Sequence, residues 1–572
     1  AATGTAIGVV SSSNSLVGVN ADDKVGTTVT ALLTNGNYVV GSPTWKNGGM
    51  GAEDGAATWG NGTVGVTGAV SSANSLVGTA HFSHVGSLIV PLTNGNYVVG
   101  SPDWNDTVSK SGAVTWGNGS TGVAGSVSSA NSLVGGSAQD RIGSQIIALS
   151  NGNYVTASSY WTNGAAANAG AVTWGNGTAA TTGFVSASNS LVGTSTNDRI
   201  GSSVTALTGN GNYAVGSPFW TDGAVAGVGA VTWGNGTVGV AGAVSSSNSL
   251  VGTNPYDSVG SEIKALANGD YTAFTALWDN GFLMDAGAMT WGSGTAGITG
   301  AVSASNSLVG SAMMAGLGAT VVPLSNGGYV YAASLYSSSP TSMMVGAAAW
   351  SSTGKALTGM ISPVNSFIGW GGSQVLGGVG IGGLTLYAAG NDGTLILAHN
   401  GASASVAGRV YVGLPVTLLT YARAQDQTIT IHPDAVTAVL NTGTALNLQA
   451  NTDITVDSDI TVNNPAGNGG AFSLWAGRSI LLNANIVTDN GAFTALANAK
   501  ASTGVVNTAR DSGAAVITMA AGKTIDAGTG AVTLTLDTGA GNTSTASGDI
   551  TLDGITAGTI TVENAGPDGG DI

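Results

Sequence analysis

The chain contains no cysteine, and only 7% of its 572 residues are charged. Without cysteine, a disulfide scaffold, a cysteine-ligated metal site and thiol catalysis are all excluded. An ordinary helical or α/β protein carries about 25% charged residues, which clothe the exposed faces of its helices. The shortage of charge, together with 93 glycines and 43% hydrophobic residues, predicts a folded, all-β chain.

Basic residues are especially scarce, because 13 Lys and Arg stand against 29 Asp and Glu, for a net charge of −16. Nucleic-acid binding requires a basic stripe, and anionic membrane surfaces attract basic segments, so we expect neither partner. No apolar run of about 18 residues is present, which argues against membrane insertion. Residues 1–10 lack the features of a signal peptide, which predicts a mature chain or an excised piece.

An internal repeat dominates the first two thirds of the sequence. The segment Asn-Ser-Leu-Val-Gly, called the landmark below, recurs every 57 to 60 residues, and its seventh copy reads Asn-Ser-Phe-Ile-Gly. The copies begin at Asn14, Asn74, Asn131, Asn189, Asn248, Asn306 and Asn365. Seven units therefore occupy residues 14 to about 415, within a repeat domain of residues 1–415.

Each unit contains four short segments, separated by loops and by Asn-Gly turns. In the fourth unit these segments are residues 201–207, 212–215, a third that contains Val231 and Trp233, and 238–245. Asn-Gly favours the tight turns of hairpins, so we expect four antiparallel strands per unit. Val231 and Trp233 lie two residues apart and share one face, which we expect to be buried.

Seven four-stranded units predict a seven-bladed β-propeller. Residues 5–13 match the fourth segment of a unit, while the seventh unit decays after Leu386. This offset predicts a ring that the N-terminal strand closes, in a blade completed from both ends of the domain. The alternative is a β-solenoid that continues throughout the chain, with three coils per unit.

The repeats resemble the FG-GAP repeats of integrin-α-type propellers. The resemblance rests on residues 198–204, 210–218 and 229–231, and it extends over six units. That family binds calcium at an Asp-rich turn between the first two strands of a blade. Here the turn has shrunk to Asn35-Gly36-Asn37 and its copies, so we expect neither calcium nor another cofactor.

After residue 416 a shorter rhythm of alternating apolar segments begins, including residues 428–431, 454–456, 472–474 and 480–482. Short stacked strands without long helices predict a right-handed parallel β-helix over residues 416–572. Residues 470–497 are similar to the coils of filamentous-haemagglutinin-like bacterial exoproteins, in which such coils form the stalk. No capping segment precedes Ile572, so we expect the chain to continue or another subunit to cover the end.

Few residues point to chemistry. His81 and His84 are the only close pair of histidines, and loop residues explain them better than a metal site. Acidic residues precede the first strand in four units, where a turn or a side-chain cap explains them better than catalysis. They are Asp23, Asp140, Asp198 and Asp257, replaced by Ser83 and Ala315 in two other units. No catalytic constellation is apparent, and we expect no enzyme.

Tryptophan forms two series. The first lies in the third segment, where alternation places it in the core: Trp59, Trp116, Trp174, Trp233, Trp291 and Trp350. The second opens the preceding loop, where it either packs between blades or stacks on sugar rings: Trp45, Trp104, Trp161, Trp220 and Trp278. We favour packing, but this second series supplies the candidate ligand-binding residues.

Four Asn-Gly-Thr/Ser segments satisfy the glycosylation sequon, although a hairpin turn explains them without sugar. They begin at Asn61, Asn118, Asn176 and Asn235.

Two functions fit these features. The first is an extracellular bacterial adhesin, a non-catalytic head on a β-helical stalk that attaches to a cell-surface glycan or protein, as in a biofilm. The second is a self-assembling subunit of a surface layer, sheath or filament, whose partners are copies of itself. Both functions imply a secreted or cell-surface location.

Overall fold

A computed structural model provides the structure of the chain. The described residues are 9–32, 34–48, 53–316, 319–323, 327–333, 336, 347–351, 355–362, 366–368, 384–389, 394–399, 409–413, 420–421, 431, 433–441, 443–464 and 467–572. Two compact units divide the chain, one built mainly from residues 1–361 and the other mainly from residues 380–572. The boundary expected near residue 415 stays a prediction. Within the described ranges, no helix reaches the length and apolarity needed to cross a bilayer.

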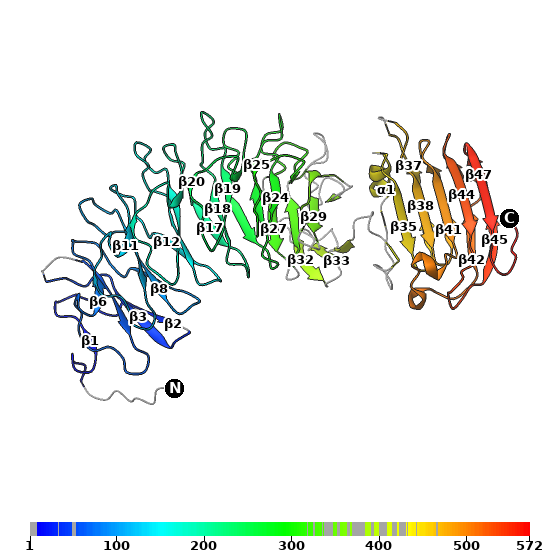
Figure 1. Ribbon diagram of the computed structural model, residues 1–572. Helices are drawn as coiled ribbons and strands as arrows, with labels where there is room; N and C mark the ends of the chain where they lie inside the picture. The colour runs from blue at the N-terminus through cyan, green and yellow to red at the C-terminus, as the bar shows by residue number, and fades with distance from the viewer. Residues whose placement is uncertain are drawn as a thin grey trace, which may run out of the picture. The chain divides into compact units, whose positions relative to one another are not determined.

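Each repeat folds into a small sheet, as the fourth repeat illustrates (Figure 1). Its strands β17 (Ser203–Ala206), β18 (Tyr213–Ser217) and β19 (Ala230–Gly234) pair antiparallel in chain order. The landmark strand β21 (Ser249–Val251) pairs antiparallel with β19 and is the fourth strand. The expected four-stranded antiparallel sheet is therefore present.

The fourth strand is not the segment that the sequence predicted. Residues 238–245 contain β20 (Gly242–Ala243), which leaves its own sheet and pairs in parallel with the landmark strand β16 (Ser190–Val192) of the preceding sheet. Gly242 has a φ of 100°, a conformation that favours glycine. Each of the first five sheets is completed in this way by two residues of the following repeat, so neighbouring repeats are interlocked.

The same strands recur along the chain. The other first strands are β2 (Thr28–Leu32), β7 (Leu88–Pro91), β12 (Gln145–Ala148), β22 (Glu262–Ala265) and β27 (Ala319–Pro323). The other second strands are β3 (Asn37–Ser42), β8 (Tyr97–Ser101), β13 (Tyr154–Ser158), β23 (Tyr271–Thr275) and β28 (Tyr329–Ala333). The other third strands are β4 (Ala56–Gly60), β9 (Ala113–Gly117), β14 (Ala171–Gly175), β24 (Ala288–Gly292) and β29 (Ala347–Ser351).

The remaining strands of the repeats are short. The other landmark strands are β1 (Leu16–Val17), β6 (Ser75–Val77), β11 (Ser132–Val134), β26 (Ser307–Val309) and β31 (Phe367–Ile368). The other crossing strands are β5 (Gly68–Ala69), β10 (Gly125–Ser126), β15 (Gly183–Phe184), β25 (Gly300–Ala301) and β30 (Gly359–Met360).

The local chemistry of the landmark explains why it recurs. Asn248 accepts a hydrogen bond from the Ser245 amide at 2.9 Å and donates one to the Ala243 carbonyl at 2.9 Å, which fixes the turn before the strand. The Ser249 hydroxyl lies 2.7 Å from the buried Thr232 hydroxyl of the neighbouring strand. Leu250 and Val251 are buried in the core. Each of these landmark residues therefore makes a specific contact.

A buried tyrosine begins the second strand in the second to sixth repeats, whereas Tyr38 of the first repeat is half-buried. Tyr154 is fully buried, and burial raises the pKa of its hydroxyl to about 12. A Cβ atom added to Gly175, which follows the half-buried Trp174, would lie 2.0 Å from the Tyr154 ring. The repeated Trp-Gly pair is thus explained by the tyrosine that occupies the space over the glycine.

Polar joints connect consecutive repeats. The Gly177 carbonyl of the third repeat accepts hydrogen bonds from Asn94 Nδ2 at 2.8 Å, Asn96 Nδ2 at 2.8 Å and Trp116 Nε1 at 2.9 Å, all in the second repeat. In other repeats, the equivalent two asparagines and tryptophan donate to the carbonyls of Gly119, Gly236 and Gly294. The prediction that the first tryptophan series lies in the core needs correction, because Trp59, Trp116, Trp174, Trp233 and Trp291 are half-buried and the first four bond to these joints.

The all-β class is confirmed, with propeller-like blades in the repeats. The blades are antiparallel, so a solenoid that continues throughout the chain is excluded for the described repeats. Closure of the ring by the N-terminal strand stays a prediction, because residues 1–8 and 369–383 lie outside those described. Val10 is 73% exposed, whereas its counterparts in later repeats are 2–6% exposed: Val70, Val127, Val185, Val244, Val302 and Ile361.

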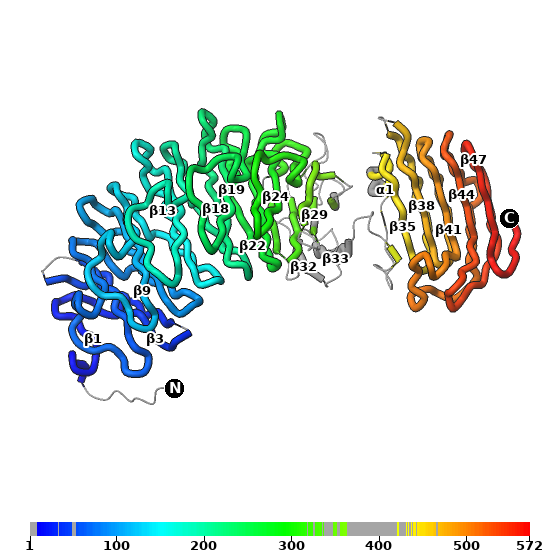
Figure 2. The backbone as a smooth tube through the Cα atoms, viewed as in Figure 1, coloured from blue at the N-terminus to red at the C-terminus, as the bar shows by residue number. Residues whose placement is uncertain are grey.

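The second unit begins with an antiparallel sheet of β32 (Leu384–Ala389), β33 (Thr394–His399) and β34 (Arg409–Gly413). Three parallel sheets follow, to which successive coils each contribute one strand (Figure 2). The first sheet contains β35 (Leu446–Ala450), β38 (Phe472–Ala476), β41 (Phe493–Ala497), β44 (Ala531–Leu536) and β47 (Thr559–Asn564). The second contains β36 (Ile454–Val456), β39 (Ile480–Leu482), β42 (Ala515–Met519) and β45 (Ser547–Thr551). The third contains β37 (Ile460–Thr461), β40 (Ile486–Val487), β43 (Thr524–Asp526) and β46 (Gly554–Thr556).

Apolar side chains at the same register stack between these coils. Phe472 pairs with Phe493, their ring centroids 5.7 Å apart, and Phe493 pairs with Val532. The parallel coils confirm a β-helix-like region, although the predicted strand at residues 428–431 lies largely outside the described residues. The sequence did not predict the helix α1 (Pro433–Leu440), which buries Val439 and Leu440 in the same core. Short 3-10 turns, Ala501–Thr503 and Asn507–Ala509, interrupt the connection from β41 to β42.

Candidate binding face

Two loops of each repeat meet at one end of its sheet. One loop joins the landmark strand to the first strand, as residues 193–202 do between β16 and β17, and the other joins the second strand to the third. The start of β17 pairs with the end of β18, whose last residue pairs with the start of β19. Both loops therefore lie at the same end of the sheet, called the loop end below.

A buried aspartate holds the two loops together. Asp198 Oδ2 accepts hydrogen bonds from the amides of Thr194 at 2.9 Å and Ser195 at 2.8 Å, while Oδ1 accepts one from the Thr221 amide at 3.0 Å in the other loop. Burial raises the pKa of this carboxyl, and the backbone hydrogen bonds offset part of the shift. Asp23, Asp140 and Asp257 make equivalent bonds. The structural explanation of these aspartates is confirmed.

The residues directly before and after the buried aspartate have left-handed backbone conformations. Asn197 and Arg199 have φ angles of 67° and 48°, and Tyr256 has 66°. Such angles cost a bulky side chain about 1 kcal/mol or more, and glycine would adopt them without strain. The loops nevertheless carry large side chains at equivalent positions, including Phe82, Tyr256 and Met314.

Exposed apolar side chains concentrate at the loop end of the third to sixth repeats. Phe282 is 99% exposed, and Tyr160 and Phe219 are 45% and 49% exposed. The other exposed residues here are Tyr256, Leu277, Met284, Met313 and Met314. Backbone hydrogen bonds tie neighbouring loops, from the Tyr256 amide to the Ala226 carbonyl and from the Met314 amide to the Met284 carbonyl. These eight residues and Arg199 are called the apolar loop face below.

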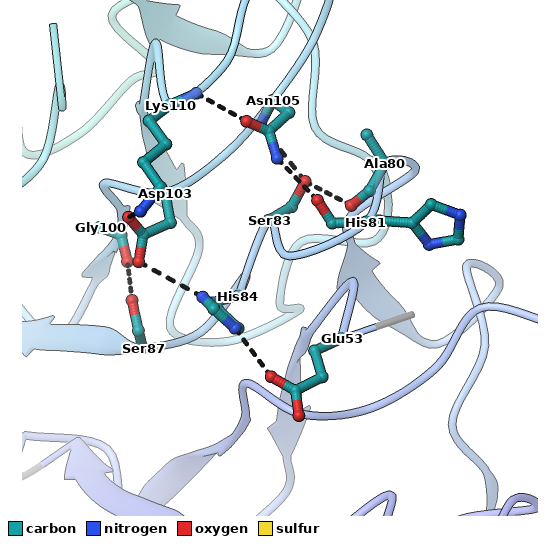
Figure 3. A network of polar contacts seen from close by, with 10 residues as sticks. All are labelled: Glu53, Ala80, His81, Ser83, His84, Ser87, Gly100, Asp103, Asn105 and Lys110. Carbon is teal, nitrogen blue, oxygen red and sulfur yellow. Dashed lines mark hydrogen bonds and ion pairs between the residues drawn. The ribbon is translucent and has the colours of Figure 1, made fainter. Parts of the chain in front are cut away.

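The first two repeats carry a charged cluster at this end, beside the exposed apolar residues Val19 and Phe82. His84 Nε2 lies 3.0 Å from Glu53 Oε2 and His84 Nδ1 lies 3.3 Å from Asp103 Oδ2, while Lys110 Nζ lies 3.5 Å from the other Asp103 oxygen (Figure 3). His81 is exposed and points away from this cluster. The histidines are thus loop residues, as expected, but His84 joins two neighbouring repeats through contacts with two carboxylates, which the sequence did not indicate.

The five candidate ligand-binding tryptophans are not part of the exposed face. Trp45, Trp104, Trp161, Trp220 and Trp278 are only 2–5% exposed, and the last four lie in apolar clusters that include residues of the preceding repeat. The hypothesis that they stack on a ligand is wrong for this structure, and the packing alternative is correct. In the third to fifth repeats the residue before the tryptophan is exposed instead: Tyr160, Phe219 and Leu277. Unlike the tryptophans, these residues vary from repeat to repeat, which is the signal that could have identified them.

Two further features of the repeats concern metal binding and the sequons. In the described part of the chain, no group of three or more His, Asp or Glu side chains could hold a metal ion. At the sequons, the side-chain oxygens of Asn61, Asn118, Asn176 and Asn235 accept bonds from amides two residues ahead, as in a turn. The expectation that the chain is not an enzyme stays a prediction.

A family model described as a repeat of unknown function (DUF5650) matches residues 1–27, 32–87, 91–144, 148–202, 207–261, 265–319 and 323–378. These stretches cover more than half of the chain. The chain belongs to this family. The DUF5650 matches share the period of the blades but not their bounds, because successive matches meet at the first strand of a blade, as at β17 between residues 202 and 207. Neither the FG-GAP resemblance nor that to filamentous haemagglutinin is supported by a match. No curated protein matches the chain.

Proposed function

We propose that the chain is a non-catalytic binding protein of the adhesin type, in which the apolar loop face of the repeats engages a glycan or protein on a cell surface. The observation that carries this proposal is the concentration of exposed Tyr, Phe, Leu and Met side chains at one end of four consecutive repeats. Exposed apolar patches are rare on monomeric soluble proteins, and where they occur they mark interaction sites.

The composition of the face supports the same function. Aromatic residues, Met and Arg are enriched at interaction surfaces, whereas Lys and Glu are depleted. The blades supply a rigid frame, because buried aspartates and interlocked strands hold the loops that carry these side chains. In the second unit, stacked coils form an elongating core that suits a spacer, and an extracellular location is part of the proposal.

One observation favours self-assembly as a second candidate. The exposed apolar side chains of the apolar loop face would also be covered by another copy of the chain. Electron microscopy at near-physiological salt separates the candidates. Isolated particles would favour the adhesin, and ordered lattices or filaments would make self-assembly the primary function.

The binding proposal is tested by coating beads with the full chain and measuring their attachment to bacterial and epithelial cell layers. We expect F282S and Y256S to reduce attachment several-fold. V64S is the matched control, because Val64 is 81% exposed but lies in the turn after a third strand, at the other end of its sheet. Attachment that is absent, or equal in all variants, would contradict the proposal.

A further inference from the structure

Arg199 lies between two aromatic rings of consecutive repeats. Its guanidinium carbon is 5.9 Å from the ring centroid of Tyr160 in the third repeat and 5.5 Å from that of Phe219 in the fourth. Both rings are about half exposed, and Arg199 is half-buried. Two cation–π contacts restrict the guanidinium, so the site is largely ordered before any ligand arrives.

No carboxylate neutralises this arginine. Among the described residues, neither Arg199 nor Arg141, its counterpart in the third repeat, has an ion pair within 4.0 Å or a side-chain hydrogen bond through its guanidinium. At the same position in the second repeat, His84 contacts two carboxylates. In the second unit, Arg478 forms a two-pronged pair with Asp453, at 2.8 Å and 2.6 Å. Among the arginines whose side chains are described, Arg141 and Arg199 alone have neither an ion pair nor a guanidinium hydrogen bond, since Arg510 bonds to Gly477 and Asn498.

These groups define a ligand chemistry. A guanidinium that stacks on rings keeps its edge free, and that edge binds a carboxylate through two parallel hydrogen bonds. The exposed faces of Tyr160 and Phe219 offer apolar surface to the C–H face of a sugar ring. Arg141 has the same position in the preceding repeat, which suits a polymer that carries negative charges at intervals.

We propose that Tyr160, Arg199 and Phe219 form a binding site for an anionic polysaccharide whose sugars carry carboxylates, with Arg141 contacting the same polymer. This inference rests on the proposed binding function and names its ligand class. Tyr160 and Phe219 stack on the sugar rings, and Arg199 binds a carboxylate. The aspartate next to Arg199 does not compete for it, because Asp198 is buried and bonds to backbone amides.

The test is calorimetric titration of the full chain with polygalacturonate and with the same polymer after methyl esterification, which removes the charge and keeps the backbone. We expect binding to polygalacturonate alone, weakened about tenfold or more by R199A and by F219A. R199K should recover only part of the affinity, because lysine lacks the planar fork. K264A is the control, because Lys264 is an exposed cation that lies on β22 rather than in a loop.

Three results would overturn the proposal: no binding to polygalacturonate, equal binding to the esterified polymer, or an equal loss in R199A and K264A, which indicates unspecific attraction. Raising the salt concentration should weaken the interaction, because part of it is ionic. The bead assay separates this inference from the proposed function. If F282S reduces attachment to cells but the chain does not bind polygalacturonate, the proposed binding function stands and only the ligand class is rejected.

Discussion

Apolar cores stabilise both units of the chain, but the units join their successive elements by different additional contacts. In the repeats, neighbouring blades are joined through single carbonyls that accept three side-chain donors, and buried aspartates cap backbone amides. In the second unit, each coil stacks apolar residues on those of the next, as Phe472, Phe493 and Val532 do. Polar joints leave the loop end free to vary, whereas stacked coils constrain every inward position. The repeats are therefore the unit in which a binding surface is able to diversify.

The largest expected effect is in the stacked coils. F493A removes a fully buried ring that contacts the coils before and after it, so we expect the second unit to lose about 3–5 kcal/mol of unfolding free energy. T494A, on the neighbouring half-buried position of β41, should change it by less than about 0.5 kcal/mol. Hydrogen exchange measured on the full chain should show faster exchange over residues 472–536 only. Equal acceleration in the repeats would contradict the separation of the two units.

A smaller effect is expected at a polar joint. In G177A the new Cβ atom would lie 1.7 Å from the Gly152 carbonyl oxygen, so the turn must move together with the carbonyl that accepts three hydrogen bonds. We expect a loss of about 1–3 kcal/mol, seen as faster exchange in the second and third repeats. G136A is the control, because the nearest atom to its Cβ, on Phe184, is 3.8 Å away. Equal effects of both substitutions would show that the joint contributes little.

Much of this fold is predictable from the sequence. The landmark spacing predicts the number and order of the blades, and alternating apolar residues predict coil strands such as β36 and β39. The register of the fourth strand is not predictable from local pattern. Residues 238–245 and the landmark are both short β-rich segments, and only pairing with another sheet distinguishes them. The helix α1 was missed although Pro433 and the spacing of Val436, Val439 and Leu440 indicate an amphipathic turn.

The candidate site was harder to predict, for a related reason. Repetition drew attention to the tryptophans, such as Trp220, but a residue that recurs in every repeat serves what every repeat needs, which is a core. The exposed residues differ between repeats, as Tyr160, Phe219 and Leu277 do at one position. Their proximity to Arg199 depends on how consecutive blades pack, and no local pattern in the sequence encodes that packing.

The smallest expected effect is on the pH dependence of stability. On acidification, the carboxyl groups discussed here change the unfolding free energy of the two units in opposite directions. Burial raises the folded pKa of Asp140, Asp198 and Asp257, against opposing backbone hydrogen bonds. Their contribution to stability is complete below the unfolded pKa of about 3.9 and is lost as the pH rises through the folded value. For Asp453, burial is outweighed by hydrogen bonds from Arg478 and Ser479, so its folded pKa is lowered. Its contribution is present above about 3.9 and is lost as the pH falls through the folded value.

Acidification from pH 7 to pH 3 should therefore lower the unfolding temperature of the second unit more than that of the repeats, as measured by calorimetry of the full chain. F493A and G177A identify the two transitions, since each shifts only one of them. In D453N, which cannot titrate at this site, the extra acid sensitivity of the second unit should shrink. Repulsion within the whole chain acts on both units, because its net charge changes from −16 to positive over this range. The test therefore compares the change in unfolding temperature between the two units. A larger decrease in the repeats would contradict the prediction and show that hydrogen bonds to the buried aspartates outweigh the effect of their burial.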